Sequence, residues 1–280
     1  MKIIQNPQEL QKTALELKRA GKSIALVPTM GYLHAGHLSL IDIARKEADI
    51  VIVSIFVNPT QFGPNEDLDK YPRDFERDSQ LCREHDTDII FAPPPGVMYP
   101  ANHSVWVEET VLSRKLCGLS RPIHFRGVTT VVAKLFHLSL ADVAVFGQKD
   151  AQQALIIRRM VRDLDFPIRI ITAPLVRDTD LVALSSRNAY LSPDERKRAQ
   201  ILSRSLFAAR AAIENGTPIS DVRKSTLNAI ASHADKVDYV EIYDSETLDT
   251  PTAETTEVLI ALAAFFGKTR LIDNLLVSLK

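Results

Sequence analysis

The sequence of 280 residues predicts an α/β protein, in which a doubly wound parallel sheet is followed by a smaller C-terminal α+β domain. Up to Thr172, short apolar runs alternate with amphipathic helical segments, as expected for strands joined by crossover helices. The run Ile50–Val57 is apolar apart from one serine, which is typical of a strand covered on both faces. After about Thr179 this alternation stops. We therefore expect two domains, 1–178 and 179–280.

The first domain is expected to alternate strands and helices in a regular order. The expected strands cover residues 24–28, 50–57, 89–92, 143–146 and 168–172. The helices expected between them cover residues 38–47, 75–85, 128–138 and 151–163. The stretch Pro93-Pro94-Pro95-Gly96 should end the third strand, because proline cannot donate to a strand ladder. Parallel strands joined by helices cross over in a right-handed sense, so the sequence predicts a Rossmann-like sheet.

The second domain is expected to contain two helices and three short strands. Ser192 has the character of an N-cap, Pro193 suits the first helical position, and acidic residues follow in the first turn. That helix should run to about Asn215-Gly216, and a second should run from Ser220 to about His233. Short strands, expected to be antiparallel, cover residues 237–243, 257–265 and 269–275. This content predicts a small α+β domain of ordinary size.

The composition excludes several classes of function. The net charge of −1 gives no basic field for nucleic acid or an anionic membrane, so any anion site must be local. Cys82 and Cys117 form neither a disulfide framework nor a zinc pattern. Residues 1–10 lack the features of a signal peptide, and no apolar run reaches the ~18 residues of a membrane span. We expect a cytoplasmic protein without nucleic-acid or membrane partners.

The most informative segment, PTMGYLHAGHLS, covers residues 28–39. It joins an expected strand to an expected helix, and phosphates bind at such helix N-termini. Gly31 and Gly36 allow close backbone approach, while His34 and His37 could donate hydrogen bonds to a phosphate chain. A bare His-x-x-His pair is more often solvated or structural. A metal site would need a third ligand, which the neighbouring sequence lacks.

A second polar segment, FGQKD, ends the strand expected at residues 143–146. Gly147 permits a tight turn, and the mobile charge of Lys149 suits phosphate. Asp150 could instead serve as the cap of the helix that follows. Gln153 is expected to face the same crevice one turn further on. These residues predict a second phosphate contact at the edge where the histidine pair lies.

Three further groups of polar residues fit an anion site. Arg187, next to Ser185 and Ser186, could clamp a phosphate or simply form a polar turn. Asn58 and Gln61 follow the strongest strand and offer contacts to hydroxyl and carboxylate groups. Further cations, which could also be ordinary surface residues, are Arg73, Arg121 and Arg126. Because several such groups follow successive strands, the sequence predicts a nucleotide site at one edge of the sheet.

Six blocks of the sequence resemble one known family. They are residues 28–37, 54–63, 71–73, 125–128, 146–153 and 185–188. In this order they resemble the pantoate–β-alanine ligase family, within the nucleotidyltransferase superfamily, over essentially the whole chain. One His-Ala-Gly-His block would be weak evidence, whereas six ordered blocks are specific.

The resemblance implies an AMP-forming ligase of pantothenate biosynthesis, on the route to coenzyme A. Pantoate and ATP with Mg²⁺ would give pantoyl adenylate and pyrophosphate, and the amine of β-alanine would then displace AMP. A homodimer is also implied. The adenylate is labile in water, so we expect the second domain to act as a lid that excludes solvent.

The resemblance also implies the roles of individual residues. Implied ATP-binding residues are Met30, Gly31, Tyr32, Leu33, His34, Ala35, Gly36, His37, Gly147, Gln148, Lys149, Asp150, Val176, Leu184, Ser185, Ser186 and Arg187. Gln61 and Gln153 would hold pantoate, and Gln61 would also border β-alanine. The implied catalytic residues are His37 as proton donor, with His34, Lys149 and Arg187. The protein ligands of Mg²⁺ stay unassigned, with Asp78 and Asp150 as candidates.

Three positions depart from the pattern usual in that family. Ala35 stands where an acidic residue is frequent, and Leu140-Ala141 stands where a proline is usual. Leu181 stands where glycine is common, and such a position often requires a positive φ. We therefore expect a left-handed residue in the loop before Ser185.

Two other functions remain open from the residues. The first is a nucleotidyltransferase that keeps the nucleotidyl group on a phosphorylated acceptor, which would not explain Gln61 and Gln153. The second is a nucleotide-binding module without catalytic activity. Exchange of pyrophosphate into ATP, measured with and without pantoate, separates both alternatives from the ligase.

Overall fold

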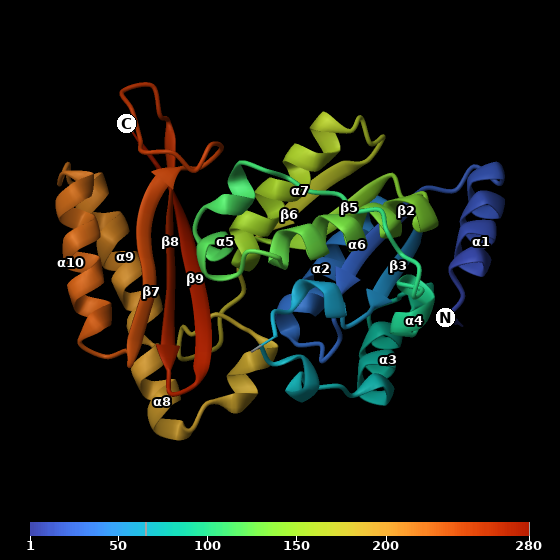
Figure 1. Ribbon diagram of the computed structural model, residues 1–280, viewed down its shortest axis with the longest axis horizontal. Helices are drawn as coiled ribbons and strands as arrows, with labels where there is room; N and C mark the ends of the chain where they lie inside the picture. Colours follow the sequence, from blue (N-terminus) through green and yellow to red (C-terminus); the bar gives the residue numbers. More distant parts are fainter. Residues whose placement is uncertain (65, 280) are drawn as a thin grey trace. The chain divides into compact units, whose positions relative to one another are not determined.

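The structure, a computed structural model, describes residues 1–64 and 66–279. Two compact units make up the chain, Met1–Pro174 and Leu175–Lys280, and each is described here by itself (Figure 1). Within the described residues, no helix has both the length and the apolar character needed to cross a membrane.

The first unit contains the predicted parallel sheet. Its strands are β1 (Lys2–Ile4), β2 (Ile24–Thr29), β3 (Ile50–Ile55), β4 (Ile89–Phe91), β5 (Val143–Gly147) and β6 (Arg169–Ala173). They are arranged in the order β1-β4-β3-β2-β5-β6, and every pair is parallel. The strands that follow β2 in the chain, β3 and β4, lie on one side of it, and the later strands β5 and β6 lie on its other side. The order therefore reverses between β2 and β5, where ligands bind in sheets of this kind.

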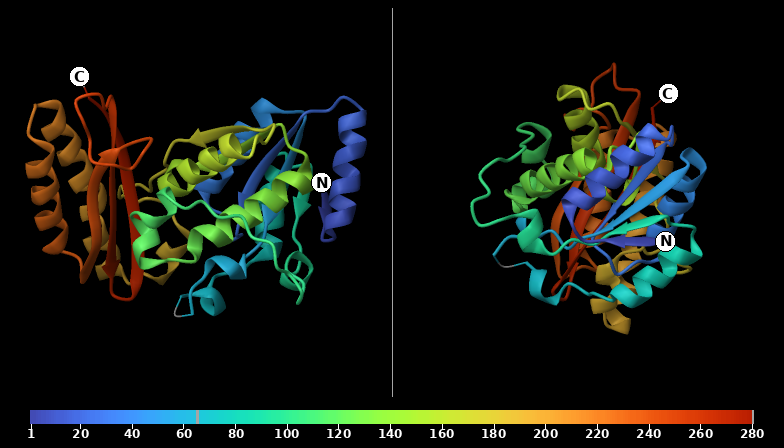
Figure 2. Two further views of the ribbon diagram at one scale, coloured as in Figure 1. Left: turned by 45° about the horizontal axis from the view of Figure 1, so that its top comes forward. Right: turned by 90° about the vertical axis from the view of Figure 1, so that its right-hand side faces the viewer.

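Helices cover both faces of this sheet (Figure 2). The main helices are α1 (Pro7–Arg19), α2 (Ala35–Glu47), α3 (Phe75–Glu84), α6 (His124–Ser139) and α7 (Ala151–Asp163). Shorter elements are η1 (Pro59–Gln61), η2 (Leu68–Lys70), α4 (Pro95–Met98), η3 (Leu112–Arg114), α5 (Cys117–Ser120) and η4 (Gln148–Asp150). The doubly wound architecture is confirmed.

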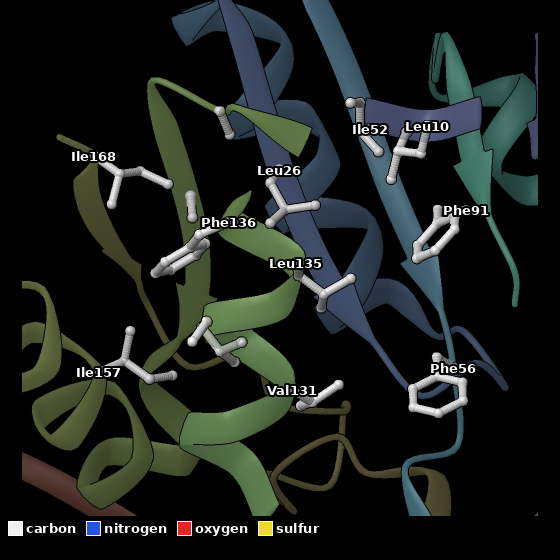
Figure 3. Packing of buried hydrophobic residues seen from close by; sticks show 14 of the residues in the cluster. Leu10, Leu26, Ile52, Phe56, Phe91, Val131, Leu135, Phe136, Ile157 and Ile168 are labelled. Atoms are coloured by element: carbon white, nitrogen blue, oxygen red, sulfur yellow. The ribbon is translucent and has the colours of Figure 1, made fainter. Parts of the chain in front are cut away.

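The two faces of the sheet carry separate apolar cores, because successive side chains of a strand point to opposite faces. On one face, Leu26 of β2 belongs to a cluster with residues of α1, α6 and α7 (Figure 3). On the other face, Ala25 and Val27 belong to a cluster with residues of α2 and α3. All three of these β2 residues are fully buried, which explains the continuous apolar run that predicts the strand.

Three aspartates secure the amino ends of the strands. Asp142 accepts a hydrogen bond from the Ile24 N–H at 2.8 Å, and Asp88 accepts one from the Val51 N–H at 2.8 Å. Asp49 accepts one from the Ser23 N–H at 2.9 Å. Each carboxylate therefore binds the backbone at the start of a neighbouring strand. This arrangement gathers acidic groups at the amino edge, away from the edge at which the anion site is predicted.

The second unit contains a three-stranded antiparallel sheet and the helices that cover it. The strands, in the order β7-β8-β9, are β7 (Lys236–Asp244), β8 (Glu257–Phe266) and β9 (Thr269–Ser278). The helical elements are η5 (Ser186–Tyr190), α8 (Pro193–Ala199), α9 (Ile201–Glu214) and α10 (Ile219–Ala231). Apolar residues of α9 and α10 form a core with the strands. The predicted α+β content is confirmed.

Some boundaries differ from the predictions. The helix expected from Ser192 to Asn215 is divided at Gln200 into α8 and α9, and α6 begins at His124 rather than Val128. The elements β1 and α1 were not predicted. The start of α1 nevertheless has a clear signal, since Asn6 caps it by accepting a hydrogen bond from the Glu9 N–H and Pro7 is its first residue.

Candidate active site

The turn after β2 is held in shape by a carboxylate from α3. Gly31 and Tyr32 adopt left-handed backbone conformations, with φ of +83° and +51°. The N–H groups of Tyr32 and Leu33 each donate to Asp78 at 2.7 Å, one to each carboxylate oxygen. Asp78 is only 1% exposed, and burial raises its pKa although the two N–H donors oppose the shift. Asp78, a candidate Mg²⁺ residue, therefore uses both of its carboxylate oxygens to hold the turn after β2.

His34 and His37 form a capping box at the start of α2. The Nδ1 atom of His34 accepts a hydrogen bond from the Gly36 N–H at 3.2 Å. The Nδ1 atom of His37 accepts one from the His34 N–H at 3.4 Å, and the ring centroids lie 4.0 Å apart. A nitrogen that accepts a hydrogen bond carries no proton, so the proton of each neutral ring is on Nε2. The cap thus leaves both Nε2–H groups available as donors.

The electrostatic surroundings keep both rings uncharged at neutral pH. Burial, followed by the positive charge of Lys149, lowers the pKa of His34 from 6.5 to about 4. Burial, the neighbouring His34 and then Lys149 lower the pKa of His37 well below its usual value. Two neutral imidazoles beside an ammonium group can stabilise negative charge without a protonated histidine.

The end of β5 brings the second predicted segment to the same edge. β2 and β5 are adjacent parallel strands, so their carboxyl ends meet where the strand order reverses. Lys149 lies in η4, directly after β5, and its Nζ atom is 3.5 Å from an Asp150 carboxylate oxygen. Among the described residues, Asp150 makes no capping hydrogen bond to α7. Asp150 therefore occupies the N-cap position of α7, as the alternative expected, but its carboxylate is not used as the cap.

Gln61 is oriented by its neighbours at the end of β3. The Nδ2 group of Asn58 donates to Gln61 Oε1 at 3.1 Å and to the Gly127 carbonyl at 3.0 Å. Gln61 Nε2 is 3.1 Å from the sulfur of Met30, which is a weak acceptor. A carboxylate or hydroxyl oxygen would be a stronger acceptor for this amide. Asn58, which is 1% exposed, is thus a positioning residue for Gln61.

The neighbouring glutamines of α7 have different surroundings. Gln152 is buried, donates to the Leu112 and Lys115 carbonyls, and accepts from the Cys117 N–H. The side chain of Gln153 is half-buried and makes no hydrogen bond with any described residue. Gln152 therefore has a structural role, while the Gln153 amide is available to a ligand.

The arginines predicted to add positive charge are already engaged. Arg121 binds Glu66 through two hydrogen bonds of 2.9 and 2.6 Å. The Arg126 guanidinium lies 4.8 Å from the centroid of the Trp106 ring. Arg73 donates to the Leu68 carbonyl at 3.2 Å. These contacts favour structural roles for all three.

His124 was not singled out from the sequence, although it lies between two of the conspicuous arginines. Its Nδ1 is 2.9 Å from the carbonyl oxygen of Gln61, and the carbonyl can only accept, so Nδ1 is the donor. Burial and the charge of Arg121 lower its pKa to about 3, while Asp150 opposes the shift. The sequence signal that could have pointed to His124 is its position three residues after Arg121.

The remaining predicted ATP contacts lie in the second unit, on a hairpin. The Leu184 N–H donates to the Val176 carbonyl at 3.1 Å, and Arg177 and Ala183 form an antiparallel bridge. Ser185 caps the following η5 by accepting from the Arg187 N–H at 3.2 Å. Five predicted residues, namely Val176, Leu184, Ser185, Ser186 and Arg187, are thereby held in one short stretch of this unit.

Two of the unusual positions adopt left-handed conformations. Leu181 has a φ of +69°, which explains why glycine would suit this place in the hairpin turn. Leu140 has a φ of +48° and caps α6. Ala35 is the exposed first residue of α2. Of the three departures only Ala35 falls among the predicted ATP-binding residues, and its place at the start of α2 still allows its backbone to face a phosphate.

Comparison with known proteins gives matches over nearly the whole chain. A family model described as pantoate-beta-alanine ligase matches residues 2–276. Pantothenate synthetase of Fervidobacterium nodosum is 50% identical over 279 residues, covering 99% of this chain and 100% of that protein. The corresponding protein of Thermotoga petrophila is 52% identical over 276 residues, covering 98% and 99%.

Solved structures agree with these matches. A crystal structure of pantothenate synthetase from Thermus thermophilus superposes with a TM-score of 0.93 at 43% identity, covering 98% of this chain and 99% of that one. A pantoate-beta-alanine ligase from Francisella tularensis, complexed with beta-gamma ATP and beta-alanine, gives 0.82 at 33% identity, covering 99% and 97%.

Proposed function

Because the chain belongs to the pantoate–β-alanine ligase family, we propose that it condenses pantoate with β-alanine through a pantoyl adenylate. A carboxylate oxygen of pantoate attacks the α-phosphorus of ATP, and pyrophosphate leaves. The amine of β-alanine then attacks the carbonyl carbon, and the bond to AMP breaks. The observation that carries this proposal is the neutral imidazole pair beside Lys149, where the strand order reverses.

The first step requires alignment and charge stabilisation. The carboxylate of pantoate is ionised at neutral pH and needs no general base. Negative charge grows on the departing pyrophosphate, where the Nε2–H donors of His34 and His37 and the charge of Lys149 can stabilise it. Arg187 is proposed to share this task. His37 donates a hydrogen bond in this scheme and does so as a neutral ring.

Pantoate is proposed to bind between the amides of Gln61 and Gln153. The contact with Asn58 fixes the direction of the Gln61 amide, because it occupies Oε1 and leaves Nε2 to donate. The weak Met30 acceptor is easily exchanged for a substrate oxygen. Gln61 is also proposed to border β-alanine, which would bring the second nucleophile next to the activated carboxyl group. The Francisella relative is described in complex with β-alanine, which supports β-alanine as the second substrate.

Mg²⁺ is proposed to enter with the phosphates of ATP. Among the described residues, no three His, Cys, Asp or Glu side chains are grouped as a metal site. Asp78 binds the turn with both oxygens, whereas Asp150, about half exposed, is the carboxylate suited to hold a water of the hydrated ion. When bound, the ion would neutralise part of the phosphate charge.

The second unit is proposed to act as a lid, and two copies of the chain to form a homodimer. Closure would protect the mixed anhydride from water. The dimer rests on the family resemblance alone. Sedimentation equilibrium tests it, and a monomer mass at concentrations well above those used for activity would contradict it.

The proposed reaction is tested by exchange of labelled pyrophosphate into ATP. We expect exchange only with pantoate, and AMP release when β-alanine is added. Exchange without pantoate would instead support a nucleotidyltransferase with another acceptor. ATP binding without any exchange would support a non-catalytic module.

A further inference from the structure

The hairpin of residues 176–184, which carries the predicted ATP contacts Val176 and Leu184, is closed by one side chain. Within residues 176–184, backbone hydrogen bonds join Leu184 to Val176 and Asp178 to Val182. The guanidinium of Arg177 donates to the Leu181 carbonyl at 3.1 Å, across the turn. Arg177 also stands directly after Val176 in the sequence and opposite Ala183 in the bridge. It therefore contacts both strands of the hairpin.

The same guanidinium joins the hairpin to the sheet. Its two terminal nitrogens donate to the two oxygens of Asp273, on β9, at 2.6 and 2.9 Å. The side chains are 14% and 2% exposed. Asp273 also accepts from the Asn274 N–H at 2.8 Å, and the centroid of the Phe207 ring lies 5.3 Å from the guanidinium. A planar fork with two bonds fixes orientation as well as distance.

We propose that Arg177 and Asp273 form a positioning pair, which holds Val176, Leu184 and the following Ser185–Arg187 stretch in the arrangement that binds ATP. This inference rests on the proposed function, since it takes those residues as ATP contacts. Neither member of the pair needs to touch the nucleotide. The fork acts through the hairpin, because a shift of Arg177 moves Val176 directly and Leu184 through the backbone bond between them.

The Arg177–Asp273 pair can be tested by substitution because both side chains are largely buried, unlike those of an ordinary surface ion pair. Removing one partner of a buried pair leaves an uncompensated charge, which disturbs its surroundings. Asp273→Asn keeps the shape of the side chain but removes its charge. Arg177→Lys keeps the charge but replaces the fork by a single flexible donor.

The control is the fork between Arg223 of α10 and Glu241 of β7, which matches the pair in its two forked bonds but is more exposed (44% and 22%). It belongs to the same unit and has two bonds of 2.7 Å, but neither residue lies in the 176–184 hairpin or η5. Glu241→Gln makes the same chemical change as Asp273→Asn. Glu241→Gln therefore shows the effect of losing a forked carboxylate that does not contact the 176–184 hairpin.

The experiment measures the Kd of a non-hydrolysable ATP analogue, the KM values for ATP and pantoate in pyrophosphate exchange, and the melting temperature. We expect Asp273→Asn and Arg177→Lys to weaken ATP binding about tenfold or more, with pantoate KM within about twofold of wild type and Glu241→Gln unchanged. Unchanged ATP affinity in folded Asp273→Asn, or equal losses for ATP and pantoate, overturns the inference. If Asp273→Asn fails to fold, Arg177→Lys decides by the same criteria. If the wild-type protein shows no pyrophosphate exchange, the proposed function is contradicted. The Kd of the ATP analogue still tests the positioning pair in that case.

Discussion

At the scale of single residues, the histidine pair shows what the sequence could and could not predict. Its place between a strand and a helix indicated a phosphate site. Its protonation could not be predicted, because the pKa values depend first on burial and then on charges such as Lys149, which is distant in the sequence. The tautomer depends on a cap in which each Nδ1 accepts a backbone N–H. The sequence likewise suggested Asp78 as a metal group, whereas the fold uses its two oxygens to hold the turn.

Replacement of His37 tests its part in adenylation. We expect His37→Ala to lower the exchange rate by a factor on the order of 10²–10³, because one donor to the developing charge is lost. His85 is the control, since it pairs with Asp42 at 2.6 Å and has no role in the proposed reaction. His85→Ala should leave the rate unchanged. An undiminished rate in folded His37→Ala would remove His37 from the mechanism.

The depressed pKa of His34 predicts a pH dependence of stability. The folded pKa of about 4 lies below the usual 6.5, so between these values the unfolded chain binds the proton more readily. Stability should therefore fall as the pH is lowered from about 6.5 towards 4. His34→Asn keeps a side chain that can cap α2 but does not titrate. Melting temperatures across this window should fall less steeply for the variant, and parallel profiles would contradict the assignment.

At the scale of elements, periodicity predicted most strands and helices, and the failures have local causes. β1 has only three residues and therefore gives no periodic signal. The division of α8 from α9 occurs at Gln200, whose own backbone is helical, so no breaker residue marks it. The orientation of the Gln61 side chain could not be predicted either, because Asn58, which holds it, is itself held by the carbonyl of Gly127 from a distant segment.

Gly127 tests the packing between α6 and η1. A Cβ at Gly127 would lie 2.5 Å from the Thr60 carbonyl oxygen and 2.7 Å from the Gln61 Cα. Gly127→Ala must therefore displace the backbone at Thr60 and Gln61, and Gln61 is proposed to hold pantoate. We expect a loss of about 1–3 kcal/mol in stability and a raised KM for pantoate, with a smaller effect on ATP. Gly96→Ala is the control, because nothing lies within 4 Å of its added Cβ. Equal behaviour of the two variants in denaturation and kinetics would contradict this account.

Leu181 tests the strain in the turn of the 176–184 hairpin. Its left-handed backbone costs a residue with a side chain about 1 kcal/mol, and glycine avoids that cost. We expect Leu181→Gly to be more stable than Leu181→Ala by roughly 0.5–1 kcal/mol in chemical denaturation. The alanine variant controls for the loss of the exposed leucine side chain. A more stable alanine variant would show that the turn carries no such strain.

At the scale of the whole molecule, the predicted parallel sheet was sufficient to group the site residues of the first unit at one edge, although the order of its strands was not predicted. The carboxyl ends of β2, β3 and β5 carry the histidine pair, Gln61 and Lys149, as neighbouring parallel strands require. In the second unit the residue types suggested only Ser185, Ser186 and Arg187 as a phosphate clamp. Val176 and Leu184 were assigned by resemblance alone, because a short hairpin held by Arg177 and Asp273 has no periodic signal.

The proposed lid motion is a property of the two units together. Small-angle scattering should show a smaller radius of gyration with ATP and pantoate than without ligands, because the labile adenylate must be kept from water. ATP alone serves as the comparison for simple nucleotide binding. Identical profiles under all three conditions would count against closure.

The most direct test of the central claim follows an oxygen atom. With pantoate labelled by oxygen-18 in its carboxyl group, attack on the α-phosphorus makes a pantoate oxygen the bridge to AMP. We expect one labelled oxygen in the AMP released when β-alanine reacts, measured by mass spectrometry. Label in inorganic phosphate, with ADP as the other product, would show attack on the γ-phosphorus and contradict the adenylate.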